Sequence, residues 1–324
     1  MRYATHTMFA IFCVLSLLGC VLIYFADTDP SLTVSEDANG NITYGISGML
    51  PESGRYMILD DTEDIDRLYL YKDDDHASLY SDSTIGSFYS QFVMILEKRG
   101  FRSVEYIDAD GLSAILSDTG SADGKAVFMM SGVLPDTVKT DDSNDIVTDW
   151  ISAGGILYWN GDPMGSYREY DGNIVESVSA IPIEMFNDSR YGTVHKKLEY
   201  SDVAIDFSFS FDRVERGLRS DYPSSKVLGA SDGTYSSYSV VRIGSGDLHV
   251  FGWSLTSMST DHLCALSDMI VCGVGYDTRI VENHVFEKGL GDLTDSVDMS
   301  HVSWDRFYLA VGKPETQHGV CLKR

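Results

Sequence analysis

The sequence predicts an α/β protein with a doubly wound, mostly parallel sheet and one N-terminal transmembrane helix. Strand-like and helix-like segments alternate between Arg67 and Trp159, and such alternation gives parallel strands joined by right-handed crossovers. The segments Ala126–Met130 and Ile156–Trp159 are continuously apolar, as in strands that are covered on both faces. Met8–Phe25 carries no charge and reaches the lower length limit of a membrane-spanning helix.

Each element of the first half has its own signature. Arg67–Lys72 alternates apolar with polar residues, which is typical of a strand. A helix follows from a cap at Ser83 or Thr84 to Arg99, with apolar residues at helical spacing. The next predicted elements are strand Phe101–Ile107, a short helix at Gly111–Leu116, strand Ala126–Met130, a helix capped by Asp142 or Ser143 and ended by Gly154-Gly155, and strand Ile156–Trp159.

The regular alternation fades after Tyr167. Residues 171–224 mix short apolar pieces with charges, which indicates an insertion. The later predicted elements are strand Lys226–Ala230, a hairpin of Tyr238–Ile243 and Leu248–Trp253, helix Asp261–Cys272 capped by Thr260 or Asp261, and a strand at Phe307–Val311. We therefore predict a cytoplasmic tip (1–7), an anchor (8–25), a stalk with an edge strand or hairpin (26–60), an α/β domain (61–275) and a C-terminal extension (276–324).

The residues around the apolar segment predict its orientation. Arg2 precedes it and Asp27 follows it, so the positive-inside bias puts the body outside the cytoplasm in a single-pass membrane protein. A cleaved signal peptide and a lipoprotein box at Leu17–Cys20 are the alternatives. The predicted topology would expose two glycosylation sequons, at Asn41 and Asn187. The three cysteines of the body are predicted to pack in the core or remain as a tail thiol.

Charge excludes one class of partner. The chain has 49 acidic and 24 basic residues, and its net charge is −25. Such a surface repels phosphate backbones, so we expect no nucleic-acid binding. Scattered acidic residues of this kind usually form a solvated surface.

The order of segments resembles a known family. RLYLYK, SFYSQFVMILEKRG, AVFMM, IVTDWISAGG and ILYWNGD, followed later by GDLHVFGWSLTS and DHLCALSDMIV, resemble the class I glutamine amidotransferase-like fold. Its non-glutaminase relatives include ThuA-like proteins and the middle domain of some β-galactosidases, and a flavodoxin-like sheet would look similar. The resemblance covers about 65–275. It implies a catalytic Cys after ILYWN, where this chain has Asn160, Gly161 and Asp162. It therefore implies that glutaminase activity is absent, since no activated nucleophile is present.

The loops after the predicted strands are expected to meet at one edge of the sheet, where ligands bind in such folds. Their polar residues are Asp73, Asp75, His76, Ser131, Asp136, Asn160, Asp162, Ser254 and Thr256. Several carboxylates and a histidine can bind a hard cation or hold the hydroxyls of a sugar. The alternative is that the sequence Asp73–His76 forms a solvated turn, which the acidic composition favours. We select Asp73, Asp75, Ser131, Asn160, Asp162 and Ser254 as candidate ligand-binding residues, with Asp162 foremost because Gly161 allows a sharp turn.

The predicted function follows from the apparent anchor and the missing nucleophile. The main expectation is a non-catalytic, extracytoplasmic domain that binds a partner protein or a cell-surface glycan, with no catalytic residue, metal or cofactor. The alternative is a carboxylate-based or metal-assisted hydrolase that acts on surface polysaccharide through Asp73, Asp75 and Asp162.

Overall fold

The computed structural model describes residues 31–36, 42–47, 54–99, 101–139, 146–161, 164–177, 185–200, 203–219, 221–230, 235–253, 259–286, 306–311 and 318–323. The chain divides into two compact units. The larger unit comprises Tyr56–His284, Ser303–Tyr308 and Cys321–Arg324, and the smaller one comprises Met1–Arg55, Val285–Val302 and Leu309–Val320. The larger unit holds all the candidate binding residues that the structure describes.

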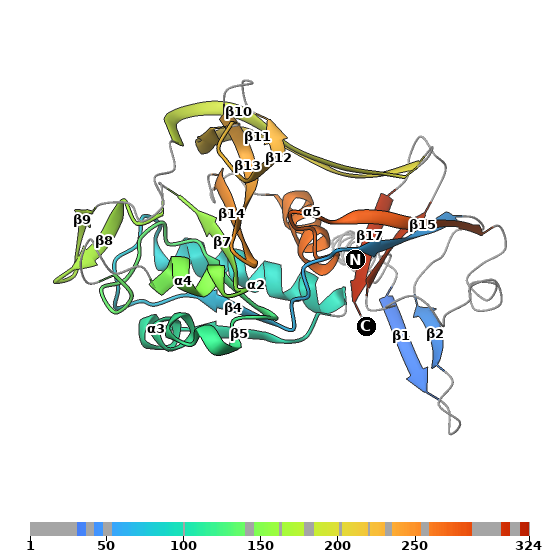
Figure 1. Cartoon of the computed structure of the whole chain (residues 1–324), viewed down its shortest axis with the longest axis horizontal. Helices are drawn as coiled ribbons and strands as arrows, with labels where there is room; N and C mark the ends of the chain where they lie inside the picture. Colours follow the sequence, from blue (N-terminus) through green and yellow to red (C-terminus); the bar gives the residue numbers. More distant parts are fainter. Residues whose placement is uncertain are drawn as a thin grey trace, which may run out of the picture. The chain divides into compact units, whose positions relative to one another are not determined.

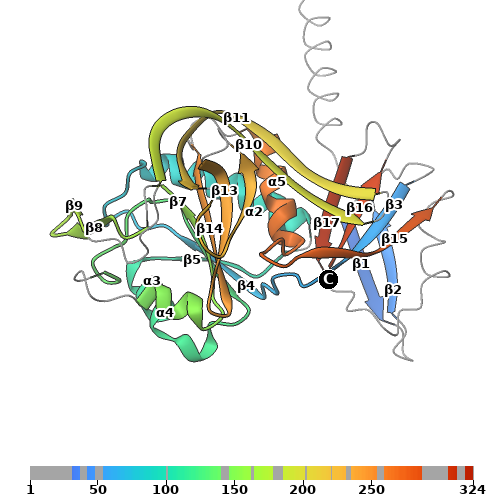
Figure 2. The same cartoon turned by 45° about the horizontal axis from the view of Figure 1, so that its top comes forward.

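A nine-stranded sheet forms the centre of the larger unit (Figure 1). Its parallel part has the order β14-β7-β6-β4-β5, with β14 at Gly246–Trp253, β7 at Ile156–Asn160, β6 at Lys125–Met129, β4 at Arg67–Tyr71 and β5 at Val104–Ile107. The antiparallel part continues from β14 through β13 (Tyr235–Ile243) to β12 (Ser225–Ala230) and to the long hairpin of β10 (Met185–Tyr200) and β11 (Val203–Arg219). Figure 2 shows this hairpin arching beyond β13.

Helices cover both faces of the parallel part. Helix α2 (Asp82–Lys98) packs against α5 (Thr260–Val271), and α3 (Ala109–Ser117) packs against α4 (Ile146–Ser152); a 3₁₀ turn, η1 (Thr119–Ser121), follows α3. Strand alternation sends Tyr69 and Tyr71 of β4 into the core on the side of α3 and α4, together with Trp150. On the other side, Phe88 of α2 stacks on Phe128 of β6.

The predicted fold class needs correction on two points. The sheet is mixed rather than mostly parallel, because the residues expected to form an insertion supply β10 and β11, which pair antiparallel with each other and join the sheet through β13 and β14. No helix among the described residues is long and apolar enough to span a membrane. The segment predicted as the anchor, 8–25, lies outside the described residues.

Several predicted elements are confirmed, with shifted ends. Helix α2 is capped by Ser81 rather than by Ser83 or Thr84, because the Ser81 hydroxyl accepts a hydrogen bond from the Thr84 amide. Helix α5 is capped by Ser259, which forms a capping box with His262. The strand predicted at 307–311 is β16 (Arg306–Val311), but it belongs to a separate four-stranded sheet.

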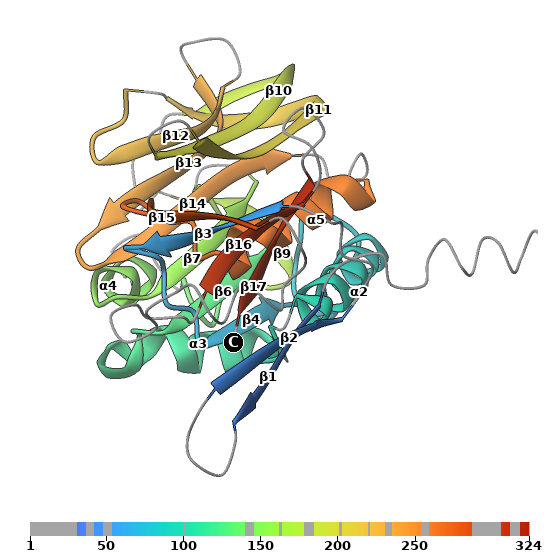
Figure 3. The ribbon, with the colours of Figure 1, turned by 90° about the vertical axis from the view of Figure 1, so that its right-hand side faces the viewer.

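That second sheet has the order β15-β3-β16-β17, with β15 at Arg279–Phe286, β3 at Gly54–Asp60 and β17 at His318–Lys323 (Figure 3). Two further pairs of strands complete the described secondary structure. They are β1 (Ser31–Glu36) with β2 (Ile42–Ser47), and β8 (Tyr167–Tyr170) with β9 (Asn173–Glu176).

An ion pair and a disulfide bond hold α5 in place. The Arg99 guanidinium donates from Nε to Asp268 Oδ1 at 2.7 Å, and both residues are buried. This ion pair joins the end of α2 to α5. Cys272, at the end of α5, is disulfide-bonded. The expectation that the cysteines of the body form no disulfide is therefore wrong for Cys272, and sequence spacing missed it because a partner remote in sequence leaves no local signal.

Candidate functional site

The strand register brings three loops to one edge of the sheet. Tyr71 of β4 pairs with Ile107 of β5 and Met129 of β6, and Met129 pairs with Trp159 of β7. These strands thus end at the same level. The loops that follow β4, β6 and β7 leave the sheet together at its carboxyl edge, where ligands are bound in open α/β sheets.

The loop after β4 is held by Asp73. Its carboxylate accepts hydrogen bonds from the amides of Asp75 and Ala109, both at 2.9 Å. Ala109 is the first residue of α3, so Asp73 also sits at the positive end of that helix dipole. Asp73 Oδ2 lies 3.1 Å from His76 Nδ1. This is an ion-pair contact rather than a well-aligned hydrogen bond, and His76 Nε2, on the other side of the ring, is directed away from Asp73.

The loop after β6 is tied to two neighbours. The Ser131 carbonyl accepts from the Leu79 amide at 2.8 Å, which joins this loop to the loop after β4. Farther along, Leu134 pairs with Arg168 of β8, and its carbonyl accepts from the Glu169 amide at 2.9 Å. This pairing sets Asp136, two residues beyond Leu134, next to Glu169.

Three side chains converge as a result. His76 Nε2 lies 3.6 Å from Asp136 Oδ1 and 3.9 Å from Glu169 Oε2, and the three potential ligand atoms all lie within 4.8 Å of one another. We call His76, Asp136 and Glu169 the edge cluster. The Glu169 side chain is only 4% exposed and its Oε2 has no hydrogen-bond partner, whereas the side chain of Asp136 is 46% exposed. One end of the cluster is therefore buried and the other is open to solvent.

The carboxylates determine the electrostatics of the cluster. Burial lowers the pKa of His76, but the close contact with Asp73 and the charge of Glu169 outweigh it, so that the pKa is raised above 6.5. Burial tends to raise the pKa of Asp73, yet the amides of Ala109 and Asp75 and the nearby His76 lower it overall. The pKa of Tyr71 is raised, first by burial and then by the charges of Asp73 and Glu169. Tyr71 therefore stays a neutral hydroxyl in a field that favours positive charge.

The structure gathers only part of the predicted site. Asp73 and the two further strand-end residues His76 and Asp136 come together as expected. Asp75 is exposed, and Ser131 is buried and donates to the Val133 carbonyl at 2.9 Å. Asn160 is fully buried at the end of β7. Asp162, Ser254, Thr256 and Asn41 lie outside the described residues, and Asn187 is placed on β10.

Gly161 makes the sharp turn that was predicted. Its φ is 135°, and a Cβ added there would come within 2.7 Å of the Gly132 Cα. A larger residue would push the loops after β6 and β7 apart. The turn is thus a close crossing of two loops, and nothing in the described residues makes it a nucleophile elbow.

Glu169 is the residue that sequence reasoning missed. It follows Tyr167, where the regular alternation ends, in a stretch with no predicted element. The available signal was a single carboxylate in the short segment Tyr167–Tyr170, which forms β8. Its partner in the loop after β6 is more than 30 residues away, so local pattern could not place it.

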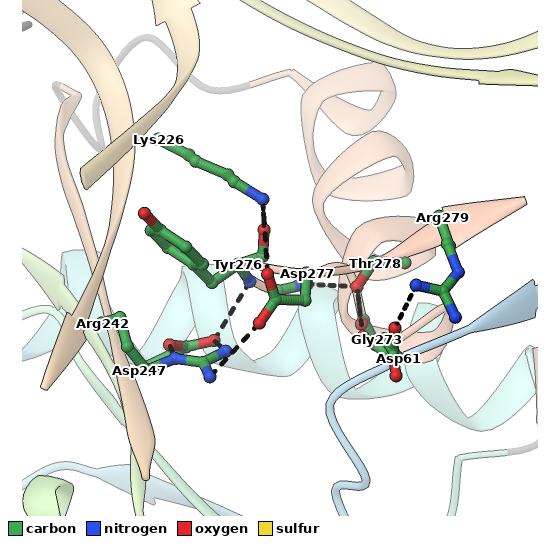
Figure 4. A network of polar contacts seen from close by, with 10 residues as sticks. Asp61, Lys226, Arg242, Asp247, Gly273, Tyr276, Asp277, Thr278 and Arg279 are labelled. Atoms are coloured by element: carbon green, nitrogen blue, oxygen red, sulfur yellow. Dashed lines mark hydrogen bonds and ion pairs between the residues drawn. The ribbon is translucent and has the colours of Figure 1, made fainter. Parts of the chain in front are cut away.

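A second polar network lies at the amino edge of the same sheet. Buried Glu63 accepts from Tyr158 Oη at 3.1 Å, and its other oxygen lies 2.7 Å from His249 Nε2. Asp247 pairs with Arg242, which also lies 3.4 Å from Asp277 (Figure 4). These groups border a cavity of about 220 Å³ lined by Glu63, Asp247 and Arg242, among others. Both oxygens of Glu63 have partners, so we assign this network a structural role.

Charge in this network makes stability depend on pH. Burial is the largest influence on Glu63 and raises its pKa above 4.5, although His249 opposes it. A raised carboxyl pKa means that the folded state holds a proton more tightly than the unfolded one, so its stabilising contribution is present below pH 4.5 and is lost as pH rises through the folded pKa. Each unit of difference between the folded and unfolded pKa of Glu63 changes the free energy of unfolding by about 1.4 kcal/mol.

We therefore expect Glu63→Gln to gain stability relative to the native chain as pH rises. Thermal unfolding of both proteins from pH 5 to pH 8 measures this. The melting temperature of the variant minus that of the native chain should increase across the range, while exposed Glu97→Gln should show a constant difference. If the difference in melting temperature for Glu63→Gln stayed flat or fell with pH, the pKa of Glu63 would not be raised in the folded protein.

Comparison with known proteins gives little sequence support for any family. No protein-family model and no curated protein matches the chain. Similar solved structures include the exo-β-1,4-mannosidase Op5Man5 from Opitutaceae bacterium strain TAV5 (11% identity, TM-score 0.37, 65% of this chain and 35% of the mannosidase). A second is a β-galactosidase from Bacillus circulans sp. alkalophilus (11% identity, TM-score 0.40, 78% of this chain and 36% of the galactosidase). A third is a cytoplasmic protein from Salmonella typhimurium LT2 (10% identity, TM-score 0.33, 72% of this chain and 88% of that protein).

These findings overturn the predicted family. The amidotransferase-like, ThuA-like or flavodoxin-like assignment is therefore withdrawn, because no family model or curated protein matches the chain and the enzymes named above are glycoside hydrolases. The chain spans about a third of the length of the two enzymes. Glycoside hydrolases are weakly consistent with the alternative prediction, a hydrolase that acts on polysaccharide. They do not match the main prediction of a non-catalytic binding domain. At these TM-scores the likeness carries no argument about the site, which rests on its own geometry.

Proposed function

We propose that the protein is a hydrolase that cleaves an uncharged glycan at the edge cluster. The observation that carries this proposal is the buried, unpartnered Glu169 Oε2 facing His76 and the half-exposed Asp136. A buried carboxylate oxygen without a donor costs folding free energy, and such costs are typical of functional sites. A carboxylate and an imidazole in one site can also act as general base and general acid in the hydrolysis of a glycosidic bond.

Charge indicates the substrate class. The edge cluster and Asp73 place three carboxylates around one imidazole, and the whole chain carries a net charge of −25. Anionic substrates are repelled from such a site. The hydroxyls of a neutral sugar can instead donate hydrogen bonds to the carboxylates. The free oxygen of Glu169 would accept a hydrogen bond from the attacking water or from a sugar hydroxyl, and the exposed side of Asp136 gives access.

We also propose that the body lies outside the cytoplasm. The disulfide at Cys272 supports this location, because disulfides persist in oxidising compartments. Surface polysaccharide is found in the same compartment. Protease treatment of intact cells tests it: cleavage of the body is expected, and full protection would contradict it.

A glycan panel tests the hydrolase directly. The full chain, in a mild detergent, is incubated with uncharged mannan, galactan and glucan and with acidic polygalacturonate, and new reducing ends are measured. We expect release from at least one uncharged glycan and none from the acidic one. Asp136→Asn should reduce the release by about 100-fold, whereas Asp110→Asn, an exposed aspartate on α3, should not change it.

Two outcomes would contradict the proposal. One is no release from any glycan, which would leave the expectation of a non-catalytic binding domain. The other is equal release by the native chain and Asp136→Asn, which would place the chemistry elsewhere. A circular dichroism spectrum of each variant confirms that it is folded.

A further inference from the structure

We infer that the edge cluster binds one divalent transition-metal ion, with His76 Nε2, Asp136 and Glu169 as its protein ligands. This inference rests on the proposed function for what the ion would do, and on geometry for where it would bind. The three ligand atoms come from three separate segments: the loop after β4, the loop after β6, and β8.

The spacing suits a metal centre. Ligand bonds of about 2.0–2.2 Å set neighbouring ligand atoms roughly 3–4 Å apart around one ion. His76 Nε2 lies 3.6 Å from Asp136 Oδ1 and 3.9 Å from Glu169 Oε2. The ligand oxygens of Asp136 and Glu169 lie within 4.8 Å of each other. A small movement of the half-exposed Asp136 would bring all three ligand atoms to bonding distance of one ion.

Glu169 supplies independent evidence for a ligand. Its side chain is more than nine-tenths buried, and its Oε2 is directed at His76 Nε2 without any hydrogen-bond donor. A side chain buried only for packing would be satisfied by a neighbouring donor or replaced by an apolar one. A bound cation compensates for both the charge and the missing hydrogen bond.

The surroundings of His76 match those of a metal-ligating histidine. Such histidines commonly turn one ring nitrogen to a carboxylate and the other to the metal. Asp73 lies 3.1 Å from Nδ1 and is itself fixed by the amides of Ala109 and Asp75. Asp73 is a positioning residue here, because it acts through His76.

The ligand types narrow the choice of ion. Imidazole favours zinc, copper, iron or nickel over calcium and magnesium, which prefer oxygen ligands. Three protein ligands leave coordination positions for water, as in catalytic rather than structural sites. A metal-bound water would lose its proton more easily than free water and would face the open side of the cluster at Asp136.

Cobalt is the most informative probe, because the visible absorption of Co²⁺ reports its coordination. The full chain is stripped with a chelator, and Co²⁺ is titrated in 0.15 M salt with 5 mM Mg²⁺ to suppress diffuse binding to the acidic surface. Retained Zn²⁺ is counted in parallel by mass spectrometry after dialysis. We expect one equivalent per chain, and an affinity at least 10-fold lower in His76→Ala, Glu169→Gln and Asp136→Asn.

Control variants and outcomes separate this inference from the proposed function. Glu97→Gln on the exposed side of α2 should bind metal like the native chain. No bound metal, or binding unaffected by all three ligand substitutions, overturns the inference. Asp136 is half exposed, so its variant should fold even if the other two do not. Metal retained without glycan cleavage would overturn the hydrolase alone. Cleavage by chain that mass spectrometry shows to be metal-free would overturn only the part of the metal in cleavage.

Discussion

Replacing Glu169 with glutamine is expected to slow glycan hydrolysis by at least about 100-fold, the usual contribution of a group that moves a proton or holds the reacting water. Glutamine keeps the volume of the side chain but removes its negative charge. The amide in place of the carboxylate could neither bind a cation strongly nor accept a proton from water. Initial rates on the glycan that the native chain cleaves measure the effect.

Stability gives this variant a second readout. Because Glu169 Oε2 is buried and unpartnered, neutralising it should leave the melting temperature equal or higher in metal-free protein. A purely structural Glu169 would instead lose stability when replaced. Glu97→Gln, exposed on α2, serves as the matched control. Glu169→Gln with more than half of the native rate would exclude Glu169 from the chemistry.

Replacing Asp268 with alanine is expected to have the largest effect on stability, about 3–5 kcal/mol. The substitution removes a carboxylate that lies 2.7 Å from Nε of the buried Arg99 guanidinium. The pair joins α2 to α5, so its loss uncouples the two helices that cover one face of the sheet. Urea unfolding of the native and variant chains measures the difference in free energy.

The exposed pair of Lys125 and Asp118 provides the comparison. Their Nζ and Oδ2 atoms lie 3.9 Å apart, and the Asp118 side chain is more than half exposed. Asp118→Ala should therefore cost less than about 1 kcal/mol. If Asp268→Ala cost no more than Asp118→Ala, the buried pair would not be the link between α2 and α5.

Local pattern was enough to predict the parallel strands. Arg67–Lys72 became β4 and Ile156–Trp159 became β7, because apolar alternation and continuous apolar runs depend on burial alone. The long hairpin of β10 and β11 was missed as sheet. Its residues carry mixed charge, and the pairing of β11 with β13 and β14 depends on contacts distant in sequence.

Contacts between residues distant in sequence also explain why only part of the candidate site could be predicted. Asp73, His76 and Asp136 follow predicted strands, so the rule that strand-end loops converge could bring them together. Asp162 was favoured from its glycine neighbour, yet a glycine shows only that the backbone can turn. Glu169 enters the site through the pairing of Leu134 with Arg168, which leaves no periodic signal. The buried carboxylate that carries the proposal could be found only from the structure.

Under the proposed function, substrate binds at the carboxyl edge of the sheet, over the edge cluster. Hydrogen exchange of the Glu169→Gln chain with and without the cleaved glycan's oligosaccharide tests it most directly, since this variant should bind without rapid turnover. We expect protection of backbone amides in residues 72–80, 131–139 and 164–170. Protection confined to residues 61–66 and 242–247, around the cavity at the amino edge, would contradict it.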